Sequence, residues 1–177
     1  MSTYAKEQKK RRWIYTFYGS KWFSFPKTFK YRIRAYQKHF NIGKNPIIEN
    51  GVILSRTHGL KGTISIGNNV LLARNTFIDY SGEVIIKDNV KIGADVIIES
   101  HHRDMEAFDR GEDINIPTKL IIEEGAYIGI RSIIMSTCNY IGKGARIGAG
   151  AVVLKDVPDN VTVVGVPAKI IKSRNNE

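Results

Sequence analysis

Residues 86–98 read Ile86-Lys-Asp-Asn-Val90-Lys-Ile92-Gly-Ala-Asp-Val96-Ile-Ile98, and an aliphatic side chain returns in this stretch every six residues. Four positions after an aliphatic residue comes a small or β-branched one, at Val90 and again at Val96. A six-residue period fits neither an α-helix, which repeats every 3.6 residues, nor a half-buried strand, which repeats every two. It fits one short strand followed by one corner, and three such units close a triangular coil.

The same period runs through most of the chain, with a slip of two residues before Ile86 and of one residue before Ile141. Its aliphatic positions are Ile42, Ile48, Leu54, Leu60, Ile66, Leu72, Ile78, Ile86, Ile92, Ile98, Ile122, Ile128, Ile134, Ile141, Ile147 and Val153. Glycine, Asn and Asp recur near the corners, where a positive φ is tolerated. The pattern predicts an all-β solenoid of about five triangular coils, stacked at the strand spacing of roughly 4.8 Å. A β-sandwich is the alternative, but it needs hairpin turns that this spacing lacks.

One polar segment, residues 100–117, interrupts the period and contains His101 and His102. The aliphatic positions on either side, Ile98 and Ile122, are separated by a multiple of six, so the coil can resume in register. A long polar insertion in a tight solenoid usually carries function. We therefore expect a protruding loop that holds part of a functional site.

Charge is distributed unevenly along the chain, whose formal net charge is +10. Residues 1–40 hold 11 basic side chains and one acid, together with 12 of the 17 aromatic residues, whereas residues 41–177 hold 16 basic and 16 acidic side chains. We expect a basic, aromatic segment over residues 1–41, folded as two short helices that Pro26 separates and that cap the solenoid. The solenoid domain should cover residues 42–172, and residues 173–177 form a tail. Basic residues interleaved with rings are typical of a segment that contacts an anionic membrane. Packing within an oligomer and nucleic-acid binding are the alternatives.

Several classes of protein are excluded by composition. The single cysteine, Cys138, cannot form an internal disulfide, and no run approaches 18 apolar residues. No secretory signal pattern follows the basic start. The expected location is cytoplasmic, at the inner face of the membrane in the case that the basic segment binds lipid. Cys138 falls on a small inward position, so we expect it in the core.

The C-terminal part carries the most specific motif, Ile141-Gly-Lys-Gly-Ala-Arg-Ile-Gly-Ala-Gly-Ala-Val-Val-Leu-Lys-Asp-Val-Pro-Asp-Asn160, followed by Val164-Gly-Val-Pro-Ala-Lys169. It resembles the ending of the hexapeptide-repeat acyltransferases, and the closest similarity is to their sugar O-acetyltransferase branch. The resemblance implies a left-handed parallel β-helix, a homotrimer and the co-substrate acetyl-CoA, with no metal. The implied reaction is acetyl transfer to a sugar hydroxyl, in a polysaccharide or lipid-linked glycan precursor. N-acylation of a nucleotide-linked amino sugar and a non-catalytic trimeric scaffold remain open.

The resemblance also implies the catalytic groups. His102 best matches the family's histidine base, with His101 as the close alternative, and Glu99 or Asp104 would orient the imidazole. Histidine suits this role because its ordinary pKa lies close to working pH. The backbone amide of Ile130 matches the family's oxyanion donor, and Tyr127 stands where the family has tryptophan beside the cofactor thiol.

Binding residues follow from the same motif match. Ala149, Gly150 and Lys155 match positions along coenzyme A, and Lys169 and Lys172 could meet its phosphates. Arg74, Asp79 and Tyr80 lie at a slip in the repeat and are candidates for contacting the acceptor sugar. The stretch 135–140 has one residue more than the family pattern, which predicts a bulged corner.

Overall fold

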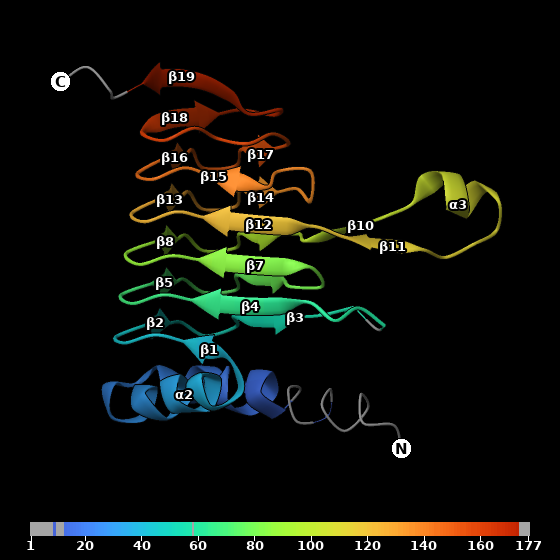
Figure 1. The fold of residues 1–177 in the computed structure, drawn as a ribbon. Helices are drawn as coiled ribbons and strands as arrows, with labels where there is room; N and C mark the ends of the chain where they lie inside the picture. Colours follow the sequence, from blue (N-terminus) through green and yellow to red (C-terminus); the bar gives the residue numbers. More distant parts are fainter. Residues whose placement is uncertain (1–8, 10–12, 58, 174–177) are drawn as a thin grey trace.

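The computed structural model describes Lys9 and residues 13–57 and 59–173, and in it the chain winds into a prism of about six coils (Figure 1). Each coil adds one parallel strand to each of three faces. The first face consists of β1 (Asn41–Ile42), β4 (Thr63–Ile66), β7 (Glu83–Ile86), β12 (Lys119–Ile122) and β15 (Tyr140–Ile141). The second consists of β2 (Ile47–Ile48), β5 (Leu71–Leu72), β8 (Lys91–Ile92), β13 (Tyr127–Ile128), β16 (Arg146–Ile147), β18 (Val161–Val164) and the antiparallel β19 (Lys169–Ser173). The third consists of β3 (Ile53–Ser55), β6 (Phe77–Asp79), β9 (Ile97–Ile98), β14 (Ile133–Ile134) and β17 (Val152–Val153).

The core is a set of aliphatic columns inside the prism, as the six-residue period predicts. Ile78 pairs with Ile98 in the next coil, and Ile98 pairs with Ile134 in the one after. Burying each such side chain contributes about 2 kcal/mol to folding. The small inward positions are buried as well: Val52, Val70, Thr76, Val90, Val96, Ala126, Ser132, Cys138, Ala145 and Ala151. The predicted solenoid is confirmed, with about one coil more than expected.

Leu60 departs from the predicted pattern. It is only half-buried and belongs to no strand, because residues 56–62 connect β3 to β4 outside the regular coil. The next inward residues are Ile64 and Ile66 on β4. The spacing of Leu60 therefore matched the period without its side chain joining the core.

Asparagines form the corner between the first and second faces. Asn45, Asn69 and Asn89 all have positive φ, which asparagine adopts more readily than most residues. Their side-chain amides stack from coil to coil, with Nδ2–Oδ1 hydrogen bonds of 3.3 Å from Asn45 to Asn69 and from Asn69 to Asn89. The expected corner chemistry is thus present.

A helical cap covers the N-terminal end of the prism (Figure 1). It contains a π-helical turn at Ile14–Tyr18, a 3-10 turn at Lys21–Ser24 and the helix α2 at Pro26–His39. Arg32 on α2 is buried, and its guanidinium donates to the carbonyls of Tyr18, Ser20 and Ile48. The cap is therefore fastened to the first coil. The first predicted helix is replaced by these two short turns in its described part, and residues 1–8 and 10–12 lie outside the described residues.

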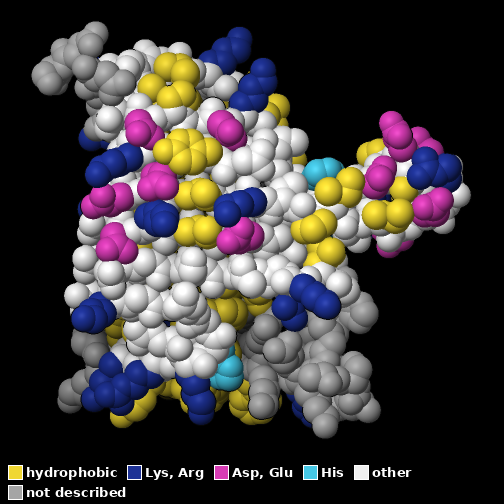
Figure 2. Space-filling view, viewed as in Figure 1, with side chains coloured by type: hydrophobic (Ala, Val, Ile, Leu, Met, Phe, Trp, Pro, Cys, Tyr) yellow, Lys and Arg dark blue, Asp and Glu magenta, His cyan; other side chains and the backbone are white. Residues whose placement is uncertain are grey.

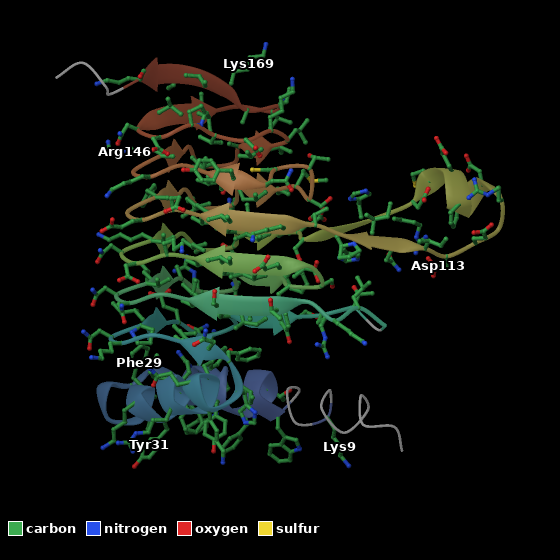
Figure 3. All side chains as sticks on the ribbon, in the orientation of Figure 1. Lys9, Phe29, Tyr31, Asp113, Arg146 and Lys169 are labelled. Atoms are coloured by element: carbon green, nitrogen blue, oxygen red, sulfur yellow. The ribbon has the colours of Figure 1, made fainter. Side chains whose placement is uncertain are left out.

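The segment predicted as a loop is an arm that projects sideways from the prism. It consists of the antiparallel strands β10 (His101–Arg103) and β11 (Asn115–Pro117), with the short helix α3 (Met105–Asp109) at its tip. Asp113, labelled in Figure 3, lies out on the arm and pairs with Arg103 across the hairpin at 3.3 Å. The coil resumes in β12, which pairs with β7, so the register is kept.

The extra residue in the stretch 135–140 is held by Asp156. The Oδ1 atom of Asp156 accepts from the backbone amides of Asn139 and Tyr140, at 2.7 and 3.0 Å. The corner tightens through a bond from the amide of Cys138 to the carbonyl of Met135. No helix among the described residues is long and apolar enough to span a bilayer, and tail residues 174–177 lie outside the described part.

Cys138 should be chemically inert in the folded protein. Burial disfavours its thiolate and raises the pKa of the thiol to about 12. Below that pKa the thiol stays protonated, so at pH 8 the thiolate should be roughly a thousandfold scarcer than in an exposed cysteine. We expect iodoacetamide to label Cys138 in urea but not in the native protein. Native labelling at the unfolded rate would contradict its place in the core.

Candidate functional site

A histidine–carboxylate pair lies at the arm corner, where the chain passes from the third face to the first and the arm leaves the prism. Nδ1 of His101 is 2.6 Å from Oδ2 of Asp79, which ends β6 one coil earlier. The carboxylate can only accept, so in the neutral imidazole Nδ1 carries the proton and Nε2 keeps its lone pair. Nε2 lies 3.2 Å from the hydroxyl of Thr57.

Asp79 is almost completely buried and is held from several sides. Its Oδ2 accepts from the amide and hydroxyl of Ser100, at 3.1 and 3.3 Å, and its Oδ1 accepts from the amide and hydroxyl of Ser81. Ser81 in turn accepts from the amide of Thr57 at 2.8 Å. This network fixes the carboxylate, and through it the plane and tautomer of the His101 ring.

His102, the next residue of β10, lines the same cleft but has different partners. His101 pairs with Pro117 and His102 with Ile116 across the arm hairpin. The His102 ring is exposed, and its Nδ1 lies 3.5 Å from the hydroxyl of Ser136, at the limit of a hydrogen bond. The two candidates are thus distinguished: His101 has a buried carboxylate partner and His102 does not.

The two carboxylates that were expected to orient the base, Glu99 and Asp104, make no hydrogen bond to either imidazole. Asp104 caps α3, where its Oδ1 accepts from the amide of Ala107 at 3.0 Å. Glu99 is half-buried beside the histidines, but its carboxylate has no hydrogen bond to either ring. Asp79, expected to contact the acceptor, is the orienting carboxylate instead. The Asp104 assignment is therefore wrong in this structure.

A cleft of about 430 Å³ opens beside this pair. Both histidines, Asp79, Thr57 and Glu99 line it. Met135 and Ser136 from the next coil and Phe77 and Ser55 from preceding coils complete its floor. In Figure 2 a histidine side chain is visible where the arm meets the prism. The cleft is polar enough to bind a hydroxylated molecule, and the imidazole lies at its edge.

A second group of predicted site residues lies at the amide corner, where the chain passes from the second face to the third. Ile130 and Ala149 occupy equivalent places there in successive coils, and the amide of Gly150 donates to the carbonyl of Ile130 at 2.8 Å. The backbone N–H groups of Ile130 and Ala149 donate no hydrogen bond within the described residues. Both residues are exposed. The corner thus offers amide donors without a backbone partner on exposed residues, as an oxyanion or an amide-bearing ligand requires.

The predicted lysines are divided between two places. Lys155 and Lys169 line one groove with Leu154, Pro167 and Ala168 near the C-terminal end of the arm corner. Lys172 lies farther along β19, opposite Thr162, and does not line that groove. Lys169, labelled in Figure 3, lies at the end of the prism opposite the cap. Lys155 and Lys169 therefore border one groove, which the carboxylate of Asp156 also lines.

The two corners lie at opposite edges of the third face. The amide of Arg131 donates to the carbonyl of Ala94, so Ile130 stacks on Ala94 of the preceding coil. Ala94 comes seven residues before His101 in the sequence. Seven residues at the rise of a strand separate the corners by about 20 Å, less what the bends remove. A single chain does not bring Ile130 and His101 to one substrate.

The remaining predicted contact residues, Tyr80, Arg74 and Tyr127, lie in three different environments. Tyr80 is buried against Phe40 of the cap, with ring centroids 6.0 Å apart, so it cannot touch an acceptor as predicted. Arg74 is exposed but lies at the amide corner, away from the arm cleft. Tyr127 is exposed on β13, flanked by Lys91 in the coil before and Arg146 in the coil after.

Two functional candidates were missed from the sequence, Thr57 and the orienting role of Asp79. The signal for Asp79 was available in the repeat. Because Ile78 stacks on Ile98, the residue after Ile78 must lie beneath the residues that follow Ile98, where His101 is. Thr57 gave no such signal, because it lies in the irregular β3–β4 connection. Within the described ranges, no three His, Cys, Asp or Glu side chains gather as metal ligands.

Comparison with curated proteins finds acetyltransferases. The serine acetyltransferase of Buchnera aphidicola is 31% identical over 141 residues, covering 80% of this chain and 48% of that protein. The galactoside O-acetyltransferase of Escherichia coli is 31% identical over 120 residues, covering 63% of this chain and 58% of that protein. The chain thus spans about half the length of the curated relatives it matches. No family model matches it.

Solved structures share the fold along nearly the whole chain. A hexapeptide-repeat acetyltransferase of Vibrio cholerae, complexed with acetyl-CoA, has a TM-score of 0.80 at 21% identity, covering 97% of this chain and 87% of that one. A galactoside acetyltransferase in complex with coenzyme A has a TM-score of 0.79 at 24% identity, covering 97% and 82%. The N-acyltransferase AntD of Bacillus cereus, in complex with dTDP and 3-hydroxybutyryl-CoA, has a TM-score of 0.64 at 27% identity, covering 76% and 72%.

The solved structures agree with the coil architecture. The handedness implied by the resemblance, a left-handed β-helix, is that of the structural neighbours. The chain is thus similar in sequence to acetyltransferases, and it shares the left-handed β-helix fold of hexapeptide-repeat acetyltransferases.

Proposed function

We propose that this protein transfers an acetyl group from acetyl-CoA to a hydroxyl of a sugar, as a unit of a polysaccharide or a lipid-linked glycan precursor. The observation that carries the proposal is the His101–Asp79 pair at the edge of a polar cleft. The similarity to a galactoside O-acetyltransferase supports a sugar as acceptor.

His101 is the proposed base. With its Nδ1 proton held by Asp79, Nε2 is free to take the proton of an acceptor hydroxyl that replaces the Thr57 hydroxyl beside it. The alkoxide oxygen then bonds to the acetyl carbon as the C–S bond breaks, and the proton on Nε2 passes to the leaving thiolate. Asp79 stabilises the imidazolium in between. A base so placed contributes about 10²–10⁴-fold to the rate. His102, which lines the same cleft, is left to contact the acceptor.

The donor side of the reaction is proposed to come from the amide corner of a second chain. The amide of Ile130 would receive the charge that develops on the thioester oxygen, and Ala149 and Gly150 would border the pantetheine arm. Because the corners of one chain lie far apart, the complete site requires two chains, and a cyclic homotrimer would build three such sites. Tyr127, next to the amide corner, would lie beside the thiol.

Lys155 and Lys169 are proposed to bind the phosphates of coenzyme A. They line one groove, and lysine acts as a compact point charge toward phosphate. Lys172 lies beyond the groove and would act only at longer range. Leu154, Pro167 and Ala168 give the groove apolar walls, so it would bind mainly by charge and apolar contact.

N-acylation of a nucleotide-linked amino sugar is the second candidate. The observation in its favour is the similarity to an N-acyltransferase whose structure contains dTDP. The stripe of Lys91, Tyr127 and Arg146 on the second face could bind a nucleotide by charge and ring stacking.

The test is to measure the thiol released from acetyl-CoA with a panel of acceptors: a β-galactoside, maltose, an oligosaccharide, L-serine and a dTDP-amino sugar. We expect release that depends on a sugar hydroxyl and yields an alkali-labile ester. An alkali-stable amide on the amino sugar would establish N-acylation instead. No binding of acetyl-CoA at physiological concentration would favour the non-catalytic scaffold.

A further inference from the structure

The outward side of the cap is a surface of exposed aromatic rings, which we call the cap surface. Its rings are Trp13, Phe17, Trp22, Phe25 and Tyr31. Trp22 is 79% exposed, Phe25 64% and Trp13 63%. Figure 3 shows Tyr31 projecting from the cap away from the prism. Five large rings so exposed on one short cap mark a binding surface rather than ordinary surface residues.

The folding of the cap does not need these rings. Its inner side is held by buried Arg32, by Tyr36, whose hydroxyl donates to the carbonyl of Val52 at 2.5 Å, and by Phe40. Among the exposed rings, Phe17 packs on Trp13 with centroids 6.0 Å apart, and it also contacts the half-buried ring of Phe23 at 5.2 Å. They are therefore available to a partner.

Cations share the cap surface with the rings. Lys21, Lys30, Arg34 and Lys38 are all exposed. The sequence contains no Asp or Glu between Glu7 and Glu49, so no nearby acid neutralises them along the chain. Figure 2 shows Lys and Arg side chains among hydrophobic ones at this end of the molecule.

We propose that the cap surface docks on an anionic phospholipid bilayer. Tryptophan and phenylalanine partition into the interfacial region of a bilayer, while lysine and arginine meet the anionic headgroups. Duplex DNA would be bound by the cations and would leave the rings exposed. The surface lies at one end of the prism, and the arm projects sideways from it (Figure 1). Docking therefore leaves the arm cleft open to an acceptor at the membrane. The proposal does not depend on the reaction proposed above.

Tryptophan fluorescence can report this docking without an added label. Its only two tryptophans are Trp13 and Trp22, both on the cap surface. We expect the emission of the full-length protein to be that of water-exposed indole without lipid. With vesicles that contain about 30% phosphatidylglycerol in phosphatidylcholine, the emission should move to shorter wavelength. The protein should also co-sediment with these vesicles. Both effects should weaken at high salt.

Single and paired substitutions sharpen the test. Trp22→Ser, and separately Lys21→Glu with Lys30→Glu, should each weaken vesicle binding about tenfold or more without changing Tm. Ile171→Ser is the matched control, because Ile171 is 64% exposed at the opposite end of the prism, and it should bind as the native chain does. Three results would overturn the proposal: equal binding to neutral vesicles, binding to duplex DNA but not to vesicles, or an emission already shifted without lipid and unchanged by it. The last result would mean that the rings are buried between copies of this chain.

Discussion

Replacing His101 by alanine should reduce the rate of acetyl transfer by at least about a hundredfold, because the acceptor hydroxyl loses its base. The ring is about three-quarters buried, but its contacts are polar and end at Asp79 and Thr57. We therefore expect Tm and the oligomeric state to change little. The measurement is steady-state thiol release with the best acceptor, together with a melting curve.

Two further variants separate catalysis by His101 from a general disturbance of the cleft. His102→Ala removes an exposed ring with one long contact and should cost less than about tenfold. Asp79→Asn keeps the shape of the side chain, but an amide no longer fixes the tautomer of the His101 imidazole. This variant should therefore lower kcat by at least about tenfold. If His102→Ala were the more damaging of the two histidine variants, His102 would be the base and His101 a structural residue.

Replacing Gly82 by alanine should be among the most destabilising single changes in the prism. A Cβ atom there would lie 1.8 Å from the carbonyl oxygen of Thr118 and 2.5 Å from that of Ser100. Both are backbone atoms at the root of the arm, so neither can rotate away. We expect the free energy of unfolding to fall by about 3 kcal/mol or more, measured by urea denaturation.

Gly111, at the tip of the arm, provides the matched control for Gly82. A Cβ atom at Gly111 would meet nothing within 4 Å, but its φ of +83° disfavours alanine. That backbone cost is about 1–2 kcal/mol and is confined to the arm. A Gly82→Ala protein as stable as the Gly111→Ala protein would show that the arm root can relax and that the coils pack less tightly there than described.

The coil architecture could be predicted from the sequence because each coil repeats the same local choice. Each coil contains an inward aliphatic residue, a small residue and a corner close together in the sequence. The stacked coils repeat this local pattern. The site could be predicted in part. His101 and His102 stood out as polar residues within a repeat, but their order of importance depends on which ring meets the carboxylate of Asp79. The partner of His101 lies one coil away, and residue spacing within the arm alone does not reveal it.

Where the structure differs from the sequence-based prediction, tertiary packing explains the difference. Tyr80 follows Asp79 directly, yet it lies beyond the end of β6 and its ring packs against Phe40 of the cap. Asp104 has the right chemistry to orient a histidine but meets the first turn of α3 instead. Leu60 matched the period but fell in an irregular connection.

The central claim, that the site is shared between two chains, is tested most directly with mixed oligomers. His101→Ala disables the arm corner, and Ala149→Glu places an acid on the exposed amide corner, where coenzyme A is expected to lie. Each variant alone should be nearly inactive. Random equimolar mixing within a cyclic trimer pairs an intact arm corner with an intact amide corner at about one interface in four, so activity should return to about a quarter of the native rate. Mixed oligomers as inactive as the parents would contradict a site built from two chains.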